Sequence, residues 1–266
     1  VGPSIPTFFA DKIGHLNLLL IAAVLLMLPI AFICRLERLL ISDLGNEDVN
    51  ADLTGDRQLS SNPFSGFTTF IRNPYLLAIG LFIVLYVVMN TFIYFELRKM
   101  MGDFDRDVRT QIWGGIDLAV NSIAFVTALF ATGRLATRFG MSTTLAIIPA
   151  LMVGGWLVVA LSPVLAVMAG LQVARRAGNY AVTRPGREIL FTAVDADTRF
   201  KAKPVIDIVV YRGGDMLTAW FYTALTATLS LGTAGIAVVS AVVAAIWAGA
   251  GIFLGRAYDR EAKESE

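Results

Sequence analysis

The chain has a single cysteine, Cys34, and a single histidine, His15, and these two scarcities exclude several kinds of site. One cysteine cannot form a disulfide within the chain, and one histidine leaves little material for a metal site. The sequence also lacks a glycine-rich loop with P-loop spacing, and it lacks a nucleophile paired with an activating base. We therefore expect no metal, no cofactor and no enzymatic activity.

Charge is scarce as well. Charged residues make up 16% of the chain, hydrophobic residues make up 56%, and the mean hydropathy is +0.67. Ordinary soluble domains are about 25% charged and less apolar. The net charge of +1 gives no indication of a nucleic-acid partner. The composition therefore indicates an all-α, polytopic protein whose partner is membrane lipid.

Apolar runs of about 20 residues recur along the chain, and as helices each could cross roughly 30 Å of hydrocarbon. The first run is Leu16–Ile33. The other runs lie at about 75–96, 112–133, 142–161, 164–183, 208–230 and 234–255. We expect about seven transmembrane helices.

The segment 42–70 is different in character. It mixes acidic residues with glycine, asparagine and serine and has no apolar periodicity before Phe64, which indicates a solvated linker. The helical spacing of Phe64, Phe67 and Ile71 predicts a short helix along the membrane surface. Residues 1–14 are too short to span and show no signal-peptide pattern, so we expect the end of a preceding helix in a longer protein.

The links between the runs differ in basic residues. Most lysines and arginines lie near 35–72, 134–138, 184–203 and 256–263, whereas the links at 162–163 and 230–233 have none. By the positive-inside rule the basic links are cytoplasmic. The link at 97–109 mixes both signs and contributes little to this orientation. The tail from Arg256 is expected to be a cytoplasmic helix.

Two arginines lie deep in the fifth expected span. Counting 1.5 Å per residue from Val164 places Arg175 and Arg176 roughly 17 Å into it, where an unpaired charge is costly. Side chains at i, i+4 and i+8 share a helix face. This rule gives two neighbouring stripes: Arg176, Tyr180 and Arg184, and beside them Arg175, Asn179 and Thr183. Guanidinium groups suit phosphate or carboxylate oxygens, so the stripes predict anion binding; the alternative is that either arginine pairs with an acid on another helix.

The next span begins with a similar repeat, Asp207, Tyr211 and Asp215. Arg212 lies inside this repeat, followed by two glycines that permit close approach of a helix or a substrate. We expect Asp215 to pair with Arg176 or Arg184 when no substrate is bound, so that exchange of partners could act as a gate. A permanent salt bridge between two helices remains the alternative.

Further polar stripes lie in the earlier spans. Tyr86, Asn90 and Tyr94 form one stripe, and Asp117 with Asn121 forms another. Such stripes usually face a bundle interior, and a direct contact with a solute is the less common role. Asp117 could carry a proton in a coupled mechanism, although no basic partner lies near it in the sequence.

Two motifs resemble a known family. The segment from Gly133 to Gly140, Gly-Arg-Leu-Ala-Thr-Arg-Phe-Gly, resembles the loop signature of the major facilitator superfamily, in which the second glycine caps a helix and makes a tight turn. A longer pattern resembles the bacterial and plastid-type ATP:ADP antiporters. It comprises Arg-Pro-Gly-Arg-Glu-Ile-Leu-Phe-Thr from 184, Arg-Phe-Lys-Ala-Lys-Pro-Val-Ile-Asp from 199 and Tyr-Arg-Gly-Gly-Asp from 211.

The resemblance implies the end of helix five and helices six to twelve of a facilitator fold. On that layout, residues 1–41 end the N-terminal half, 42–73 form the cytoplasmic link between halves, 74–260 form a six-helix bundle and 261–266 a cytoplasmic tail. It also implies nucleotide exchange by alternating access in a bacterial inner membrane, together with a missing N-terminal half. Arg175, Arg176, Arg184 and Arg212 would then serve the phosphates.

Two other functions remain open. The first is a facilitator for another organic anion or a drug, driven by protons through Asp117 or Asp215; competition by nucleotides would distinguish it. The second is a non-transporting membrane scaffold or sensor in which the arginines are structural pairs. The number and helical alignment of the polar residues within the spans argue against the second.

Overall fold

The structure, a computed structural model, describes residues 15–43, 64–130 and 132–264. The chain divides into two compact units, Val1–Pro63 with Asp105–Gly115 and Phe64–Phe104 with Ile116–Glu266. In the first unit, α2 (His15–Asp43) is a long helix that contains Pro29 and an apolar stretch, Ala23–Leu36. It confirms the helix expected from Leu16. Residues 1–14 and most of the expected linker, 44–63, lie outside the described residues.

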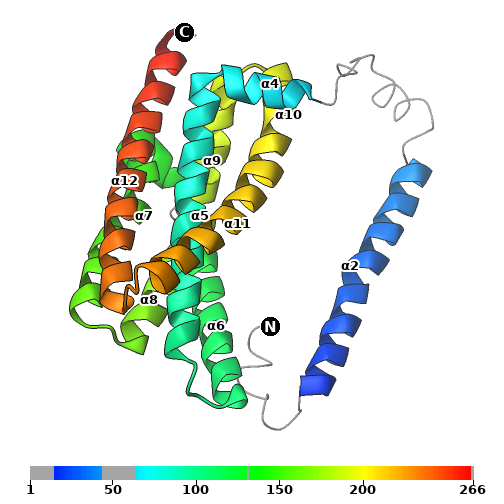
Figure 1. Cartoon of the computed structure of the whole chain (residues 1–266). Helices are drawn as coiled ribbons and strands as arrows, with labels where there is room; N and C mark the ends of the chain where they lie inside the picture. The colour runs from blue at the N-terminus through cyan, green and yellow to red at the C-terminus, as the bar shows by residue number, and fades with distance from the viewer. Residues whose placement is uncertain (1–14, 44–63, 131, 265–266) are drawn as a thin grey trace. The chain divides into compact units, whose positions relative to one another are not determined.

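The second unit is a helical bundle (Figure 1). Its long helices are α5 (Pro74–Met100), α7 (Thr132–Leu161) and α12 (Thr233–Glu264), and α6 (Arg106–Phe130) enters it at Ile116. The shorter elements are α4 (Ser65–Arg72), α8 (Leu165–Gly178), η1 (Asn179–Thr183), α9 (Arg184–Leu190), η2 (Phe191–Ala193), α10 (Ala196–Pro204), η3 (Val205–Val210), α11 (Tyr211–Thr223) and η4 (Ala224–Thr228). The regular elements within the described ranges are all helical, as expected.

Three helices are long and apolar enough to cross a membrane: Pro74–Met100, Gly140–Leu161 and Thr233–Arg260. They correspond to the expected spans at 75–96, 142–161 and 234–255. The expected spans at 164–183 and 208–230 belong instead to longer helical rods, α8–η1–α9–η2 and α10–η3–α11–η4, which meet at Val194 and Asp195. The predicted link 184–203 is therefore mostly helical. Within it, Asp195 caps the start of α10 by accepting a hydrogen bond of 2.9 Å from the Thr198 N–H.

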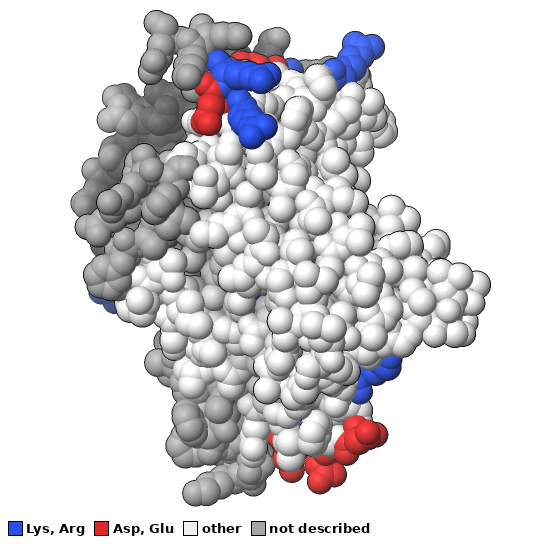
Figure 2. Space-filling view, turned by 90° about the vertical axis from the view of Figure 1, so that its left-hand side faces the viewer, with Lys and Arg blue, Asp and Glu red and all other residues white. Residues whose placement is uncertain are grey.

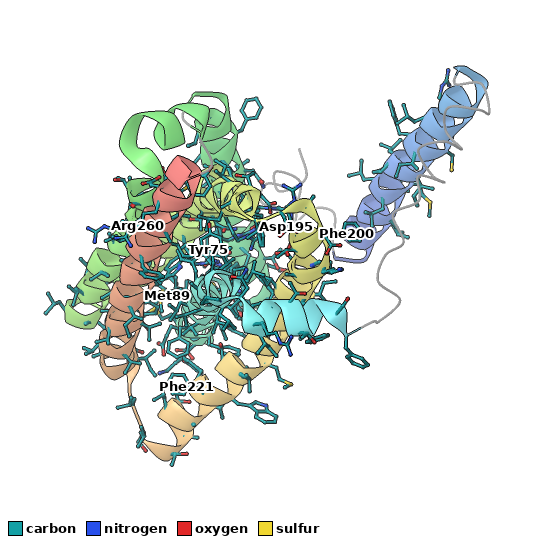
Figure 3. All side chains as sticks on the ribbon, turned by 90° about the horizontal axis from the view of Figure 1, so that it is seen from above. Tyr75, Met89, Asp195, Phe200, Phe221 and Arg260 are labelled. Carbon is teal, nitrogen blue, oxygen red and sulfur yellow. The ribbon has the colours of Figure 1, made fainter. Side chains whose placement is uncertain are left out.

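Helix α5 is the central element of the bundle. It packs against α12, α11 and α8, and it buries apolar side chains on nearly all sides, including Leu76, Phe82 and Phe92. Figure 3 shows two more of its residues, Tyr75 and Met89, among the side chains in the middle of the bundle. Between helices in a membrane, close packing of such side chains rather than their removal from water stabilises association, so the buried side chains of α5 hold the surrounding helices together.

Helices α7 and α12 lie side by side (Figure 1) and approach each other closely through small residues. A Cβ atom on Gly251 would come within 3.0 Å of the Leu145 carbonyl oxygen, and one on Gly255 would overlap the backbone of Ser142. The described surface seen in Figure 2 is broadly uncharged, with charged side chains near the top and the bottom of the view. This is the distribution that a surrounding hydrocarbon layer requires.

Three expected local features are confirmed. The helix predicted from Phe64, Phe67 and Ile71 is α4, and it packs against α10. Gly140, expected to end a helix and make a turn, adopts φ 77° and ψ 165° and breaks α7 into two parts. Positive φ angles of this kind favour glycine because it has no Cβ. The expected tail helix from Arg256 is also present, since α12 continues to Glu264.

Candidate functional site

A cavity of about 490 Å³ opens between polar stretches of the two helical rods, residues 179–188 and 203–212, and the middle of α5. It is lined by Tyr86, Asn179, Tyr180, Arg184, Arg187, Glu188, Lys203, Asp207, Tyr211 and Arg212. Four of these residues are cationic, two are acidic and three are tyrosines. Seven of these ten residues were identified in the sequence: Tyr86, Asn179, Tyr180, Arg184, Asp207, Tyr211 and Arg212.

Two π-helical segments, η1 and η3, bring these residues together. Each has a proline close by, Pro185 two residues after η1 and Pro204 immediately before η3. Proline has no N–H to continue the regular α-helical bonding. A π turn bonds residue i to residue i+5 and therefore holds an extra residue. Across η1, side chains before and after the segment consequently do not share the face that i, i+4, i+8 spacing predicts. Across η3, by contrast, Lys203, Asp207 and Tyr211 have this spacing and all line the cavity.

The cations of the cavity fall into two classes. Lys203 Nζ lies 2.5 Å from Glu188 Oε2, and Arg187 Nη2 lies 3.4 Å from Asp207 Oδ1 and 3.6 Å from Glu188 Oε1. Arg184 and Arg212, by contrast, are exposed and have no ion pair with any residue that the structure describes. These two guanidinium groups are therefore available to an anion that enters the cavity.

Glu188 is tied to its cationic neighbours. Partial burial acts to raise the pKa of its carboxyl group, but the hydrogen bond and charge of Lys203, together with Arg187, outweigh burial and hold that pKa below its ordinary value. The carboxylate form of Glu188 is thus stabilised in the folded protein. It fixes Lys203 and one edge of Arg187 in place.

Arg176 does not lie at the cavity. Its Nη1 forms a short hydrogen bond and ion pair with Asp117 Oδ1 on α6. Asp117 has no basic residue near it in the sequence, and its partner lies far along the chain. The predicted pairing of Arg176 with Asp215 is therefore wrong, and the alternative that Arg176 pairs with an acid on another helix is confirmed. The physical reason is η1, which turns Arg176 away from the face of Tyr180 and Arg184.

Arg175 lies behind the cavity wall. Its side chain is 1% exposed, Nη1 donates to the Tyr86 hydroxyl at 3.0 Å and Nη2 donates to Gln172 Oε1 at 3.0 Å. Its guanidinium carbon also lies 5.5 Å from the centre of the Tyr86 ring. Arg175 therefore reaches the cavity through Tyr86, and no direct contact with a solute is needed for its charge to act there.

The remaining predicted residues are dispersed. Asp215, Asn90 and Tyr94 do not line the cavity. Asp215 has no hydrogen bond or ion pair with another described residue, and Tyr94 is exposed and contacts the ring of Phe95. Asn121 donates from Nδ2 to the Asp117 carbonyl oxygen at 2.9 Å, so its side-chain amide forms a hydrogen bond within its own helix.

Sequence reasoning missed four residues at or near the site: Arg187, Glu188, Lys203 and Gln172. Arg187 and Glu188 follow Arg184 at i+3 and i+4, a spacing that places all three on one face of α9. That signal was present in the sequence. Lys203 carried no comparable signal, because its partner Glu188 lies on another helix. Gln172 lies three residues before Arg175 on α8, a helical spacing that was also present in the sequence.

A second polar pair lies farther along α5. Glu96 is fully buried, and its Oε1 accepts a hydrogen bond of 2.7 Å from the Tyr222 hydroxyl, whereas its Oε2 has no partner in the structure. The rings of Phe92 and Phe95 contact Tyr222. The pair joins α5 to α11 within an aromatic environment.

Within the described ranges, no three His, Cys, Asp or Glu side chains are grouped so that they could hold a metal ion. The polar groups of the cavity are mainly hydrogen-bond donors, which favour an anion over a cation. Comparison with other proteins adds no assignment: no family model, curated protein sequence or solved structure matches this chain.

Proposed function

We propose that this chain forms the C-terminal part of a secondary transporter that exchanges nucleotides, ATP- and ADP-like anions, across a membrane by alternating access. The observation that carries the proposal is the pair of unpaired guanidinium groups, Arg184 and Arg212, in a cavity that also has three tyrosines. Guanidinium forks bind phosphate oxygens in a bidentate manner. Aromatic rings stack on nucleobases regardless of base identity.

The dimensions and surroundings of the cavity support the same proposal. A volume of about 490 Å³ falls within the range of roughly 300–1,000 Å³ that is usual for small-molecule sites. The three apolar helices supply a membrane setting. Polar side chains within such a bundle usually mark a substrate pathway. The paired acids Glu188 and Asp207 keep Lys203 and Arg187 ordered when the cavity is empty.

The proposal includes the layout that the family resemblance implies. The chain would supply about seven transmembrane helices, the end of helix five and helices six to twelve of a facilitator fold. The other half of the transporter would form the opposite wall of the pathway. The membrane would be the bacterial inner membrane, with the C-terminus in the cytoplasm. Movement of the two halves would then expose the cavity to each side in turn.

Exchange in proteoliposomes tests the function. The protein containing this chain is reconstituted, the vesicles are preloaded with ATP, and uptake of labelled ADP is measured. We expect uptake that requires internal nucleotide. Arg212→Ala and Arg184→Ala should each raise the KM for ADP about 10- to 100-fold, because a charge-assisted hydrogen bond contributes about 1.5–3 kcal/mol.

Arg199→Ala is the matched control, since Arg199 is also an exposed arginine but does not line the cavity. It should leave ADP uptake unchanged. Absence of uptake by the unmodified protein with every internal nucleotide tried would contradict nucleotide exchange. In that case, uptake of another organic anion driven by a proton gradient would support the facilitator alternative.

A further inference from the structure

The guanidinium of Arg175 is a buried positive charge without a carboxylate partner. No Asp or Glu oxygen of the described residues lies within 4.0 Å of it, and its Nε has no hydrogen-bond partner. Its two bonds go to neutral groups, the hydroxyl of Tyr86 and the amide oxygen of Gln172. A charge that is compensated only by dipoles is costly to bury. It would be compensated better by an anion nearby.

The neighbouring residue offers an internal comparison. Arg176 is more exposed than Arg175, yet it has a carboxylate partner in Asp117. If stability alone decided the pairing, the more deeply buried charge would be the one with a carboxylate partner. In this protein the more deeply buried charge, Arg175, is the one without such a partner. This arrangement is expected where the missing counter-charge is supplied by a ligand.

Tyr86 connects Arg175 to the cavity. Its hydroxyl accepts the Arg175 hydrogen bond, so the hydroxyl proton is free to be donated elsewhere. A hydroxyl that accepts from a cation is polarised and becomes a stronger donor. The ring is held by Trp247, whose centroid lies 5.8 Å away, and by Tyr211 at 6.4 Å. Tyr86 also lines the cavity.

We propose that Tyr86 donates a hydrogen bond to a phosphate oxygen of the bound nucleotide, and that Arg175 is a positioning residue that orients and polarises this hydroxyl. The inference rests on the proposed nucleotide site. Arg175 acts through the Tyr86 hydroxyl, and a hydrogen bond to an oxygen strengthens as that oxygen becomes more negative, so the effect grows with the charge of the ligand. Arg175 and Tyr86 together therefore set the preference for nucleoside di- and triphosphates over monophosphates.

Binding affinities test this proposal. The probes are adenosine, AMP, ADP and ATP, titrated calorimetrically against the protein containing this chain in lipid nanodiscs. Tyr86→Phe keeps the ring but removes the hydroxyl, and it should raise the Kd for ADP about tenfold. The loss should be absent for adenosine and should increase from AMP to ATP. Arg175→Met should give the same graded loss.

A double variant separates positioning from direct contact. If Arg175 acts through Tyr86, then Arg175→Met should cost little further affinity in the Tyr86→Phe background. Additive losses would overturn the positioning role. If Arg175→Met does not fold, Arg175→Gln, which is neutral but polar, takes its place in the same cycle. A purely structural change in either variant would weaken all four probes equally.

Tyr75→Phe is the matched control on the same helix. The Tyr75 hydroxyl donates to the Leu190 carbonyl oxygen at 3.0 Å and does not line the cavity, so its removal should leave every Kd unchanged. If the unmodified protein binds ADP and Tyr86→Phe binds it equally well, only the present inference fails. If the unmodified protein binds none of the nucleotides, the proposed function fails with it.

Discussion

At the scale of single residues, the buried hydrogen bond between Tyr222 and Glu96 gives a prediction about stability. Removing the tyrosine hydroxyl leaves a fully buried carboxylate without its one donor. Tyr222→Phe should therefore lower the free energy of unfolding by about 1–3 kcal/mol. Unfolding in detergent micelles, followed by circular dichroism, measures the change.

A second variant shows whether desolvation is the cause. In Tyr222→Phe/Glu96→Leu both polar partners are replaced by apolar groups, and the stability should recover towards that of the unmodified protein. If the double variant is less stable than Tyr222→Phe alone, packing around Glu96 rather than its hydrogen bond determines the loss.

Glu188 gives a prediction about pH. Its pKa is lowered in the folded protein against the opposing effect of burial, mainly by Lys203. A depressed pKa stabilises the folded state above the unfolded pKa of about 4.3, and the stabilisation is lost as pH falls through the folded value. The melting temperature should therefore drop as the pH is lowered from 6 to 3, by less in Glu188→Gln than in the unmodified protein. Equal drops in both proteins would contradict the role of this carboxyl group.

The residues of the cavity were predicted from the sequence where a single segment contains the whole signal. Tyr180, Arg184, Asp207 and Arg212 were identified because charge and helical spacing within one segment were enough. Partners on distant helices could not be predicted in this way, as Lys203 and the Arg176–Asp117 pair illustrate. Glu96 was missed for another reason, because it adjoins Arg98 and Lys99 and reads as part of a charged loop.

At the scale of helices, the α7–α12 contact depends on the absence of a side chain at Gly255. A single methyl group there would overlap the Ser142 backbone, which cannot yield as a flexible side chain could. Gly255→Ala should therefore destabilise the bundle by about 1–3 kcal/mol. Thermal unfolding of the purified protein in detergent measures this loss.

Gly249 on the same helix is the matched control. A Cβ at Gly249 meets no atom within 4 Å, so Gly249→Ala should be neutral or stabilise α12 by up to about 1 kcal/mol through its higher helix propensity. If the two variants have the same melting temperature, close helix approach does not limit the stability of this contact.

Apolar periodicity predicted the helices themselves well, but it could not predict their irregularities. The hydrophobic runs located α5, the second part of α7, and α12, because in those helices length and composition are decisive. The segments η1 and η3 depend on how the backbone rearranges its hydrogen bonds near Pro185 and Pro204. A regular spacing rule applied across η1 assigns Arg176 to the wrong face, whereas across η3 it correctly places Asp207 and Tyr211 together.

At the scale of the whole molecule, the membrane setting predicts which surfaces tolerate charge. Val238, Val242 and Ile246 recur every four residues on α12 and are all exposed. If this stripe faces lipid, Ile246→Arg should oppose membrane insertion by about 2.5–3.5 kcal/mol, whereas Ile246→Leu should have no effect. The fraction of chains inserted during translation into microsomes measures both. Equal insertion would mean that this stripe faces protein or water.

The two π-helical segments also affect how this chain compares with related sequences. Each segment accommodates one residue more than a regular α-helix would over the same length. A relative that is regularly α-helical where this chain has η1 would therefore be one residue shorter between Arg176 and Arg184. The residues at the two ends of its rod would still correspond to those of this chain. Its alignment to this chain requires a gap in the middle of a helix, and without that gap every equivalence on one side of the segment is displaced by one position.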